Sequence, residues 1–176
     1  VLRGNFVGTP KFNSVLILIG TLLASWMGTT GAAMLLIRPL IRANTWRSNK
    51  THIIIFFIFL VANIGGSLTP LGDPPLFIGF LKGVNFFWTT KYMFLPMVFV
   101  STILLILFYF IDNYYFSKEL HNKPKTETLN FSIHGKFNFL LLIGVVLAVI
   151  LSGFYKDSFG YIKMFGNNIR ISFLVR

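Results

Sequence analysis

Four long blocks without a charged residue constrain the fold of this chain most strongly. They cover residues 12–37, 53–72, 92–111 and 137–155, and the charged residues gather between them. About 20 apolar residues in a helix are enough to cross the hydrocarbon core of a bilayer. A soluble protein would have too little polar surface to cover four such helices. The sequence therefore predicts an all-α integral membrane protein, a single membrane domain over residues 1–176 that is multi-pass in the cell inner (cytoplasmic) membrane.

The net charge of +11 comes from Lys and Arg in the short segments between these blocks. Residues 38–52 and 112–136 carry four Lys or Arg each, and residues 82–91 carry two. Basic loops of this kind follow the positive-inside rule and favour contact with anionic lipid headgroups, so we expect the lipid bilayer and no nucleic acid as a partner. The count predicts that 38–52 and the loop 112–136 are cytoplasmic.

The first block contains two glycines that bracket two hydroxyl residues, Gly28-Thr29-Thr30-Gly31. Glycines permit a tight turn, and hydroxyls can satisfy backbone groups that such a turn frees. Residues 12–44 are therefore predicted to form a re-entrant helical hairpin with this tetrapeptide at its tip. A straight first span, with 15–37 as one continuous helix, remains the alternative.

The second block is predicted to be one discontinuous transmembrane helix over residues 53–81. Three prolines and three glycines lie between residues 63 and 75, and they prevent a regular helix there. Unwound backbone at membrane depth survives only where it is buried in protein or lines a wet cavity. A short second helix should begin near Leu76. Two further transmembrane helices are expected, a span at 92–111 and, after the cytoplasmic loop 112–136, a span at 137–155.

Asp73 is the acidic residue that stands out among the five in the chain, because the other four are placed in loops. An ionisable group at membrane depth is costly and marks an ion or proton pathway by default. A structural alternative is that Asp73 caps the helix that follows, with Pro74 at its first position. The two roles are compatible, since transporters build ion sites at the ends of half-helices.

Oxygen-rich side chains lie in both broken segments, and hard cations such as sodium prefer oxygen ligands. The hypothetical sodium ligands are Thr29, Thr30, Asn63 and Thr69. The three histidines show no ligand-like spacing, cysteine is absent, and no nucleophile–base pattern appears. The chain is therefore predicted to be no enzyme and to need no cofactor, with sodium as a transported substrate.

Two strings carry a resemblance to a known family: residues 24–44, around the sequence Ser-Trp-Met-Gly-Thr-Thr-Gly-Ala-Ala, and residues 62–75, Ala-Asn-Ile-Gly-Gly-Ser-Leu-Thr-Pro-Leu-Gly-Asp-Pro-Pro. Both are similar to the NhaD-like sodium/proton antiporters, which are grouped with citrate transporters in the ion transporter superfamily. The resemblance implies that Gly28 to Gly31 form a hairpin tip that faces an unwound loop from Thr69 to Pro75. The site that it implies comprises Gly28, Thr29, Thr30, Gly31, Asn63, Gly65, Gly66, Thr69, Gly72, Asp73 and Pro74.

The resembled family is built from two inverted repeats, and this chain shows one hairpin and one broken helix. The resemblance therefore implies a fragment, about one repeat, whose partner would be a missing second repeat or another copy of the chain. Dicarboxylate carriers of the superfamily tend to have Ser-Asn-Thr at the tip and to lack an acidic residue before Pro-Pro. Here Gly-Thr-Thr and Asp73 favour cation exchange.

Three functional hypotheses follow. The first is a sodium/proton antiporter, in which sodium or lithium ions and protons share the site at Asp73, and Asp73 carries the proton. The second is an organic-anion carrier for citrate or dicarboxylates, or an arsenite-type carrier. The third is a membrane remnant or interaction subunit that transports nothing.

Overall fold

The computed structural model describes residues 7–119, the strand residues 2–3, 132–133, 161–164 and 167–170, and the helical positions 140, 143, 144 and 147. Its helices are α1 (Pro10–Met27), α2 (Thr29–Ala43), α3 (Thr51–Phe57), α4 (Pro74–Leu81) and α5 (Trp88–Glu119). A π-helix, η1 (Ile58–Asn63), and a 3₁₀ helix, η2 (Ile64–Leu68), continue from α3. Strand β1 (Leu2–Arg3) pairs with β2 (Ser132–Ile133), and β3 (Tyr161–Met164) pairs with β4 (Asn167–Arg170), both antiparallel.

Three helical segments are long and apolar enough to cross a membrane: Pro10–Met27, Thr51–Leu68 and Trp88–Glu119. Their apolar length confirms the predicted all-α membrane fold. The two short strand pairs lie outside these segments. The predicted span at 137–155 falls outside the described residues, apart from the four helical positions named above.

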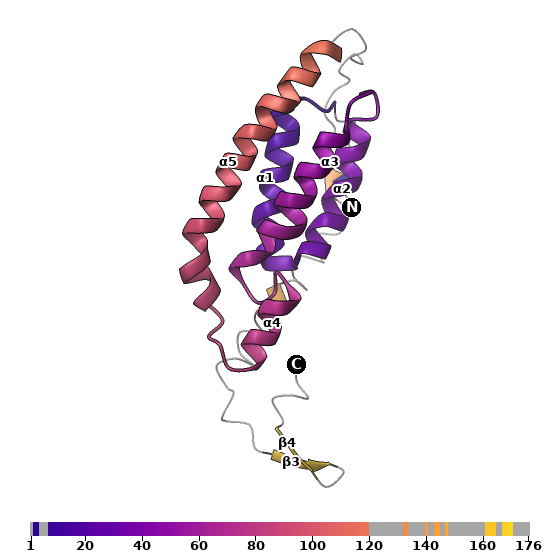
Figure 1. Ribbon diagram of the computed structural model, residues 1–176. Helices are drawn as coiled ribbons and strands as arrows, with labels where there is room; N and C mark the ends of the chain where they lie inside the picture. Colours follow the sequence, from indigo (N-terminus) through magenta and orange to yellow (C-terminus); the bar gives the residue numbers. More distant parts are fainter. Residues whose placement is uncertain are drawn as a thin grey trace.

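Helices α1 and α2 form a hairpin that turns at Gly28. The backbone of Gly28 has a φ of 83°, a conformation that glycine adopts at no steric cost. The two helices lie side by side in Figure 1, and at their far ends the amide of Asn13 donates to Asn44 Oδ1 at 3.0 Å. Gly20 lets them pack closely, since an added Cβ would come within 2.8 Å of Leu36. The structure thus has two helices joined by a turn, and not one straight helix over 15–37.

The second block is broken, as the glycine and proline pattern predicts. Helix α3 loosens into the π-helix η1, tightens into the 3₁₀ helix η2, and becomes extended at Thr69 (φ −136°, ψ 157°). Pro74 then opens α4 at its first position, where a missing N–H costs nothing. In Figure 1, α4 lies at one end of the bundle, beyond the helices α1, α2 and α3.

One apolar core joins the hairpin to the broken helix and to α5. Its buried members come from all of these elements: Ile17, Ala24, Ala32, Leu36, Leu40, Ile53, Phe57, Leu60, Val61 and Phe108. Helix α5 runs obliquely along the bundle in Figure 1. Most of its large apolar side chains are exposed, Leu95 (77%) and Phe110 (67%) among them, as expected of a helix that faces lipid.

Helix α5 begins earlier and ends later than the predicted span 92–111. It therefore includes Asp112 and Glu119, both buried, so placing these two acidic residues in a loop was wrong. Asp112 contacts the side chains of Asn13 and Arg47, from α1 and from the segment after α2. The last turns of α5 have a more polar sequence than the rest of the helix. Contacts with other elements, such as those of Asp112, stabilise these turns.

Candidate functional site

The hairpin tip touches the loop of the broken helix through backbone groups. The N–H of Thr29 donates to the carbonyl oxygen of Gly72 at 3.0 Å, and the N–H of Gly72 donates to Thr69 O at 2.9 Å. Thr29 is the first residue of α2, so its N–H has no partner within its own helix. The broken helix supplies that partner.

Ser25 and Thr69 fasten the same two segments by their side chains. The hydroxyl of Ser25 donates to Gly65 O, and the hydroxyl of Thr69 donates to Ser25 O. Thr69 Oγ1 also accepts the N–H of Leu71 at 3.2 Å. Both side chains are almost fully buried. Carbonyl groups that the irregular backbone would otherwise leave bare are thereby satisfied.

Three glycines make this contact close enough to form. A Cβ on Gly65 would lie 2.7 Å from Thr21 O, and a Cβ on Gly66 would lie 2.6 Å from the Thr29 methyl group. A Cβ on Gly72 would overlap the carbonyl oxygen of Gly66. Small residues let helix backbones approach closely in membranes, where burial of apolar surface drives packing only weakly.

Helix α5 supports the loop from the other side. The hydroxyls of Thr89 and Thr90 both donate to Leu68 O, at 2.9 Å and 2.6 Å. Leu68 ends the 3₁₀ helix η2, so its carbonyl has no further helical partner. The first turn of α5 therefore fixes the point at which the broken helix unwinds.

Several polar groups at the tip are left without a protein partner. Within the described part of the chain, the hydroxyls of Thr29 and Thr30 make no hydrogen bond, and Thr30 is exposed. The start of α2 also leaves the N–H groups of Thr30 and Gly31 without an intrahelical acceptor. The positive end of the α2 dipole lies at the same place. The tip is thus rich in donors.

Asp73 follows the residue that the tip contacts. It occupies the cap position before α4 with extended backbone (φ −143°, ψ 137°), and its side chain makes no capping hydrogen bond. Its backbone oxygen instead accepts the N–H groups of Leu76 and Phe77, at 3.1 Å and 3.2 Å. The half-buried carboxylate is therefore not committed to capping α4.

The predicted site residues are brought together only in part. Gly28, Thr29, Gly65, Gly66, Thr69 and Gly72 meet at the contact between the tip and the loop. Asn63 is exposed, and its amide donates to Ile58 O at 2.9 Å, so it closes the π-helix. Pro74 is exposed, and a Cβ on Gly31 would meet only Met27.

Three residues of this contact were missed by the sequence analysis: Ser25, Thr89 and Thr90. A signal for Ser25 exists, because Asn13, Ile17, Thr21 and Ser25 recur every four residues on α1, and all four are buried. Polar residues on the buried face of an apolar helix need partners. Thr89 and Thr90 gave no such signal, since they precede the predicted start of their span.

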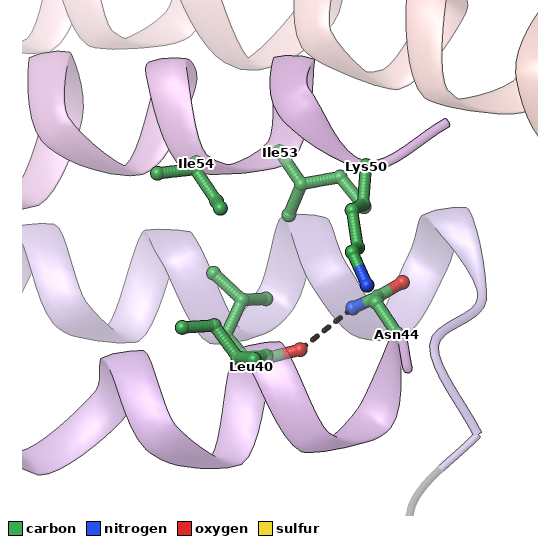
Figure 2. A pocket seen from close by; sticks show the side chains of 6 residues that line it. Leu40, Asn44, Lys50, Ile53 and Ile54 are labelled. Atoms are coloured by element: carbon green, nitrogen blue, oxygen red, sulfur yellow. Dashed lines mark hydrogen bonds between the residues drawn. The ribbon is translucent and has the colours of Figure 1, made fainter. Parts of the chain in front are cut away.

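A shallow hollow elsewhere on the bundle does not belong to this site. Figure 2 shows its lining, formed by Leu40, Ile41, Asn44, Lys50, Ile53 and Ile54. The hydrogen bond drawn there, from Asn44 Nδ2 to Leu40 O at 2.9 Å, closes the end of α2. Four of the six lining residues are apolar, and none of the six is a predicted site residue.

Comparison with protein families gives one match that covers the chain. The family described as "Putative citrate transport" matches residues 1–176. Comparison with curated proteins and with solved structures gives no match.

Proposed function

Because the chain belongs to this citrate transport family, and is thus a multi-pass secondary carrier of the citrate type, we propose that the contact between hairpin tip and broken helix binds a carboxylate anion. The observation that carries this choice is the surplus of donors at the start of α2. A carboxylate could accept from the hydroxyls of Thr29 and Thr30 and from the N–H groups of Thr30 and Gly31. Half-helix N-termini serve this purpose in transporters.

The carbonyl groups nearby favour an anion over a bare cation site. Cations in such sites are coordinated by unwound backbone carbonyls. Here the carbonyls of Ser25, Gly65, Leu68 and Gly72 each already accept at least one hydrogen bond. Thr69, a predicted sodium ligand, uses its hydroxyl both to donate and to accept. The start of α2 adds the donors that an anion needs, the hydroxyls of Thr29 and Thr30 and the N–H groups of Thr30 and Gly31.

Asp73 would then carry the coupling ion. A carboxylate beside a bound anion is unfavourable unless a proton or cation neutralises it, so anion and cation would enter together. We propose that the facing wall of the site comes from a second repeat or from another copy of the chain. Thr30 and Pro74 are exposed on the surface that such a wall would cover.

Sodium/proton antiport is the second candidate, and the uncommitted side chain of Asp73 favours it. In this mechanism one carboxylate binds either sodium or a proton, and competition between them couples the two fluxes. The two candidates differ in cargo and share Asp73. They can therefore be separated by measuring both fluxes on one preparation.

The test is uptake of labelled citrate into proteoliposomes that contain the full chain, beside sodium-induced collapse of an imposed pH gradient. The variant Thr29→Val/Thr30→Val keeps the shape of both side chains and removes their hydroxyls. We expect citrate uptake to fall at least tenfold in this variant and to survive in Thr45→Val, whose hydroxyl is at the other end of α2. Asp73→Asn should abolish dependence on the coupling ion.

Two outcomes would count against carboxylate transport. Collapse of the pH gradient by sodium, without citrate uptake and lost in Asp73→Asn, would favour the antiporter. Citrate uptake that is equal in the Thr29→Val/Thr30→Val variant and the unmodified chain would remove the hairpin tip from the substrate site.

A further inference from the structure

The hollow shown in Figure 2 is formed by α2 and α3, at the end of the bundle away from the hairpin tip. Asn44, which lines it, follows the last residue of α2, and Thr29 at the tip is the first residue of that helix. The two are separated by the length of α2, about 22 Å at 1.5 Å per residue. The hollow is therefore distinct from the site at Asp73, and the proposed function does not use it.

The walls of the hollow are aliphatic. Helix α2 contributes Leu40 and Ile41, and α3 contributes Ile53 and Ile54. Leu40 and Ile53 belong to the buried core, whereas Ile41 is 41% exposed and Ile54 is partly exposed. The hollow thus opens outward from the bundle. An aliphatic surface of this kind on a pair of membrane helices suits an acyl chain.

The hollow begins at the edge of an apolar span and continues into it. The segment Thr51–Leu68 is long and apolar enough to cross a membrane, and Lys50 immediately precedes it. Ile54 lies four residues further along, about 6 Å deeper at 1.5 Å per residue. The polar end of the hollow is therefore placed at the level of the lipid headgroups, and its aliphatic part at the level of the acyl chains. A phospholipid has its phosphate and its chains in the same order.

Lys50 is a half-buried cation that forms no ion pair with any residue the structure describes. The carboxylates at this end of the bundle, Asp112 and Glu119, are paired with Arg47 and His52 instead. A cation with reduced access to water is stabilised by a nearby anion. Lys50 is therefore available to an anion from outside the chain.

A second cation lies next to the hollow. Arg42 directly follows Ile41 on α2, is exposed, and has no acidic partner within the described ranges. Long basic side chains can lay their stems on apolar groups and keep their charge at the membrane surface. Figure 2 shows the ammonium group of Lys50 beside Asn44, at the polar end of the hollow. Basic pockets between membrane helices are typical binding sites for anionic headgroups.

We propose that this hollow binds one anionic phospholipid, with its phosphate at Lys50 and Arg42 and one acyl chain along Ile41 and Ile54. The bound lipid lies against both the hairpin helix α2 and the first turns of the broken helix, so it stabilises the packing of one on the other. A zwitterionic lipid has the same chains, but its own cation compensates its phosphate. The unpaired basic side chains therefore select the anionic lipid.

Thermal unfolding of the full chain in detergent, with and without added lipid, tests the selectivity. Phosphatidylglycerol and phosphatidylcholine with identical acyl chains differ in headgroup charge. A ligand that binds only the folded chain raises its unfolding temperature, and we expect a rise of about 5 °C with phosphatidylglycerol and a much smaller one with phosphatidylcholine. Glycerol phosphate carries the anionic group without acyl chains and should have no effect.

The role of Lys50 is tested by its affinity for phosphatidylglycerol, which native mass spectrometry measures on the folded protein. Lys50→Gln keeps most of the length of the side chain and removes its charge. We expect the affinity to fall about fivefold. Lys50→Arg keeps the charge and should bind as the unmodified chain does. Lys118→Gln removes an exposed cation from α5 and should leave the affinity unchanged.

The aliphatic walls are tested by filling the hollow. Ile41→Trp adds bulk at its open side, so the acyl chain loses its place and phosphatidylglycerol affinity should fall about fivefold. Ile55→Trp is the matched control, because Ile55 is 45% exposed on α3 and does not line the hollow. The unfolding temperature of each variant without lipid shows whether the fold is kept.

Three results would overturn the proposal. Equal stabilisation by the two lipids would show that the hollow does not select an anion. Equal loss of affinity in Lys50→Gln and Lys118→Gln would assign the binding to diffuse surface charge. Equal affinity of Ile41→Trp and Ile55→Trp would show that the acyl chain does not lie in the hollow.

Discussion

The backbone N–H of Thr29 donates to the carbonyl oxygen of Gly72 at 3.0 Å, and this bond joins the hairpin tip to the loop of the broken helix. The two residues are far apart in sequence. Each lies where its own segment stops being helical. Neither group has a hydrogen-bond partner inside its own segment, so each one satisfies the other. The two irregular segments thereby form one polar site within an apolar bundle.

Gly72→Ala should separate the tip from the loop. The new Cβ would overlap the carbonyl oxygen of Gly66, which is backbone and cannot swing aside. We expect a loss of about 1–3 kcal/mol in stability and at least a tenfold loss of transport. Thermal unfolding in detergent and flux in proteoliposomes measure the two effects. Gly79→Ala is the matched control, since its nearest neighbour would be a Val84 methyl group at 3.9 Å.

Ser25→Ala should weaken the same contact by leaving the buried Gly65 carbonyl without its donor. Hydrogen bonds between membrane helices contribute about 0.6 kcal/mol on average, and an unsatisfied buried acceptor adds to the loss, so we expect about 1 kcal/mol. A lowered unfolding temperature would show it. Ser117→Ala removes an exposed hydroxyl and should change nothing. Equal unfolding temperatures for both variants would refute the bracing role of Ser25.

Thr89 and Thr90 should behave redundantly, because both donate to Leu68 O. Each single substitution to Val leaves one donor in place, so a loss below about 0.5 kcal/mol is expected. The double variant leaves the carbonyl bare and should lose more than the sum of the single variants. Unfolding temperatures of the three variants measure this. Thr102→Val, exposed on the same helix, is the control, and strict additivity would contradict the shared acceptor.

Arg47→Met should be the most damaging substitution among those considered. It leaves two buried carboxylates, Asp112 and Glu119, without their shared cation. Breaking a buried ion pair from one side costs about 3–5 kcal/mol. Arg42→Met, exposed on α2, should stay within about 0.5 kcal/mol of the unmodified chain.

A double-mutant cycle distinguishes the ion pair from simple packing. Adding Asp112→Asn to Arg47→Met removes one of the uncompensated charges. The double variant should therefore be less destabilised than the sum of the two single variants, by roughly 0.5–3 kcal/mol. Purely additive losses in the unfolding free energy would show that Arg47 acts through its bulk alone.

The sequence by itself determined where the first block turns and where the second block breaks. Gly28 to Gly31 set the turn, the glycines and prolines between residues 63 and 75 set the unwound segment, and the uncharged block at 92–111 located the middle of α5 but not its ends. These features are local, since they follow from backbone conformation and from the length of apolar runs. The sequence also singled out Asp73, because an acidic residue within an apolar block is rare.

Only the tertiary structure decided which polar groups meet. Ser25, Thr89 and Thr90 are ordinary residues in sequence, and their partners lie on other elements. Asp112 and Glu119 read as loop residues because the chain turns polar after Ile111. In the structure both residues belong to α5 and are buried. Their partners are Arg47, His52 and Asn49, which come from the start of the broken helix and the segment before it. Local patterns do not encode long-range pairing. A charged side chain can be buried only where groups from other elements compensate its charge.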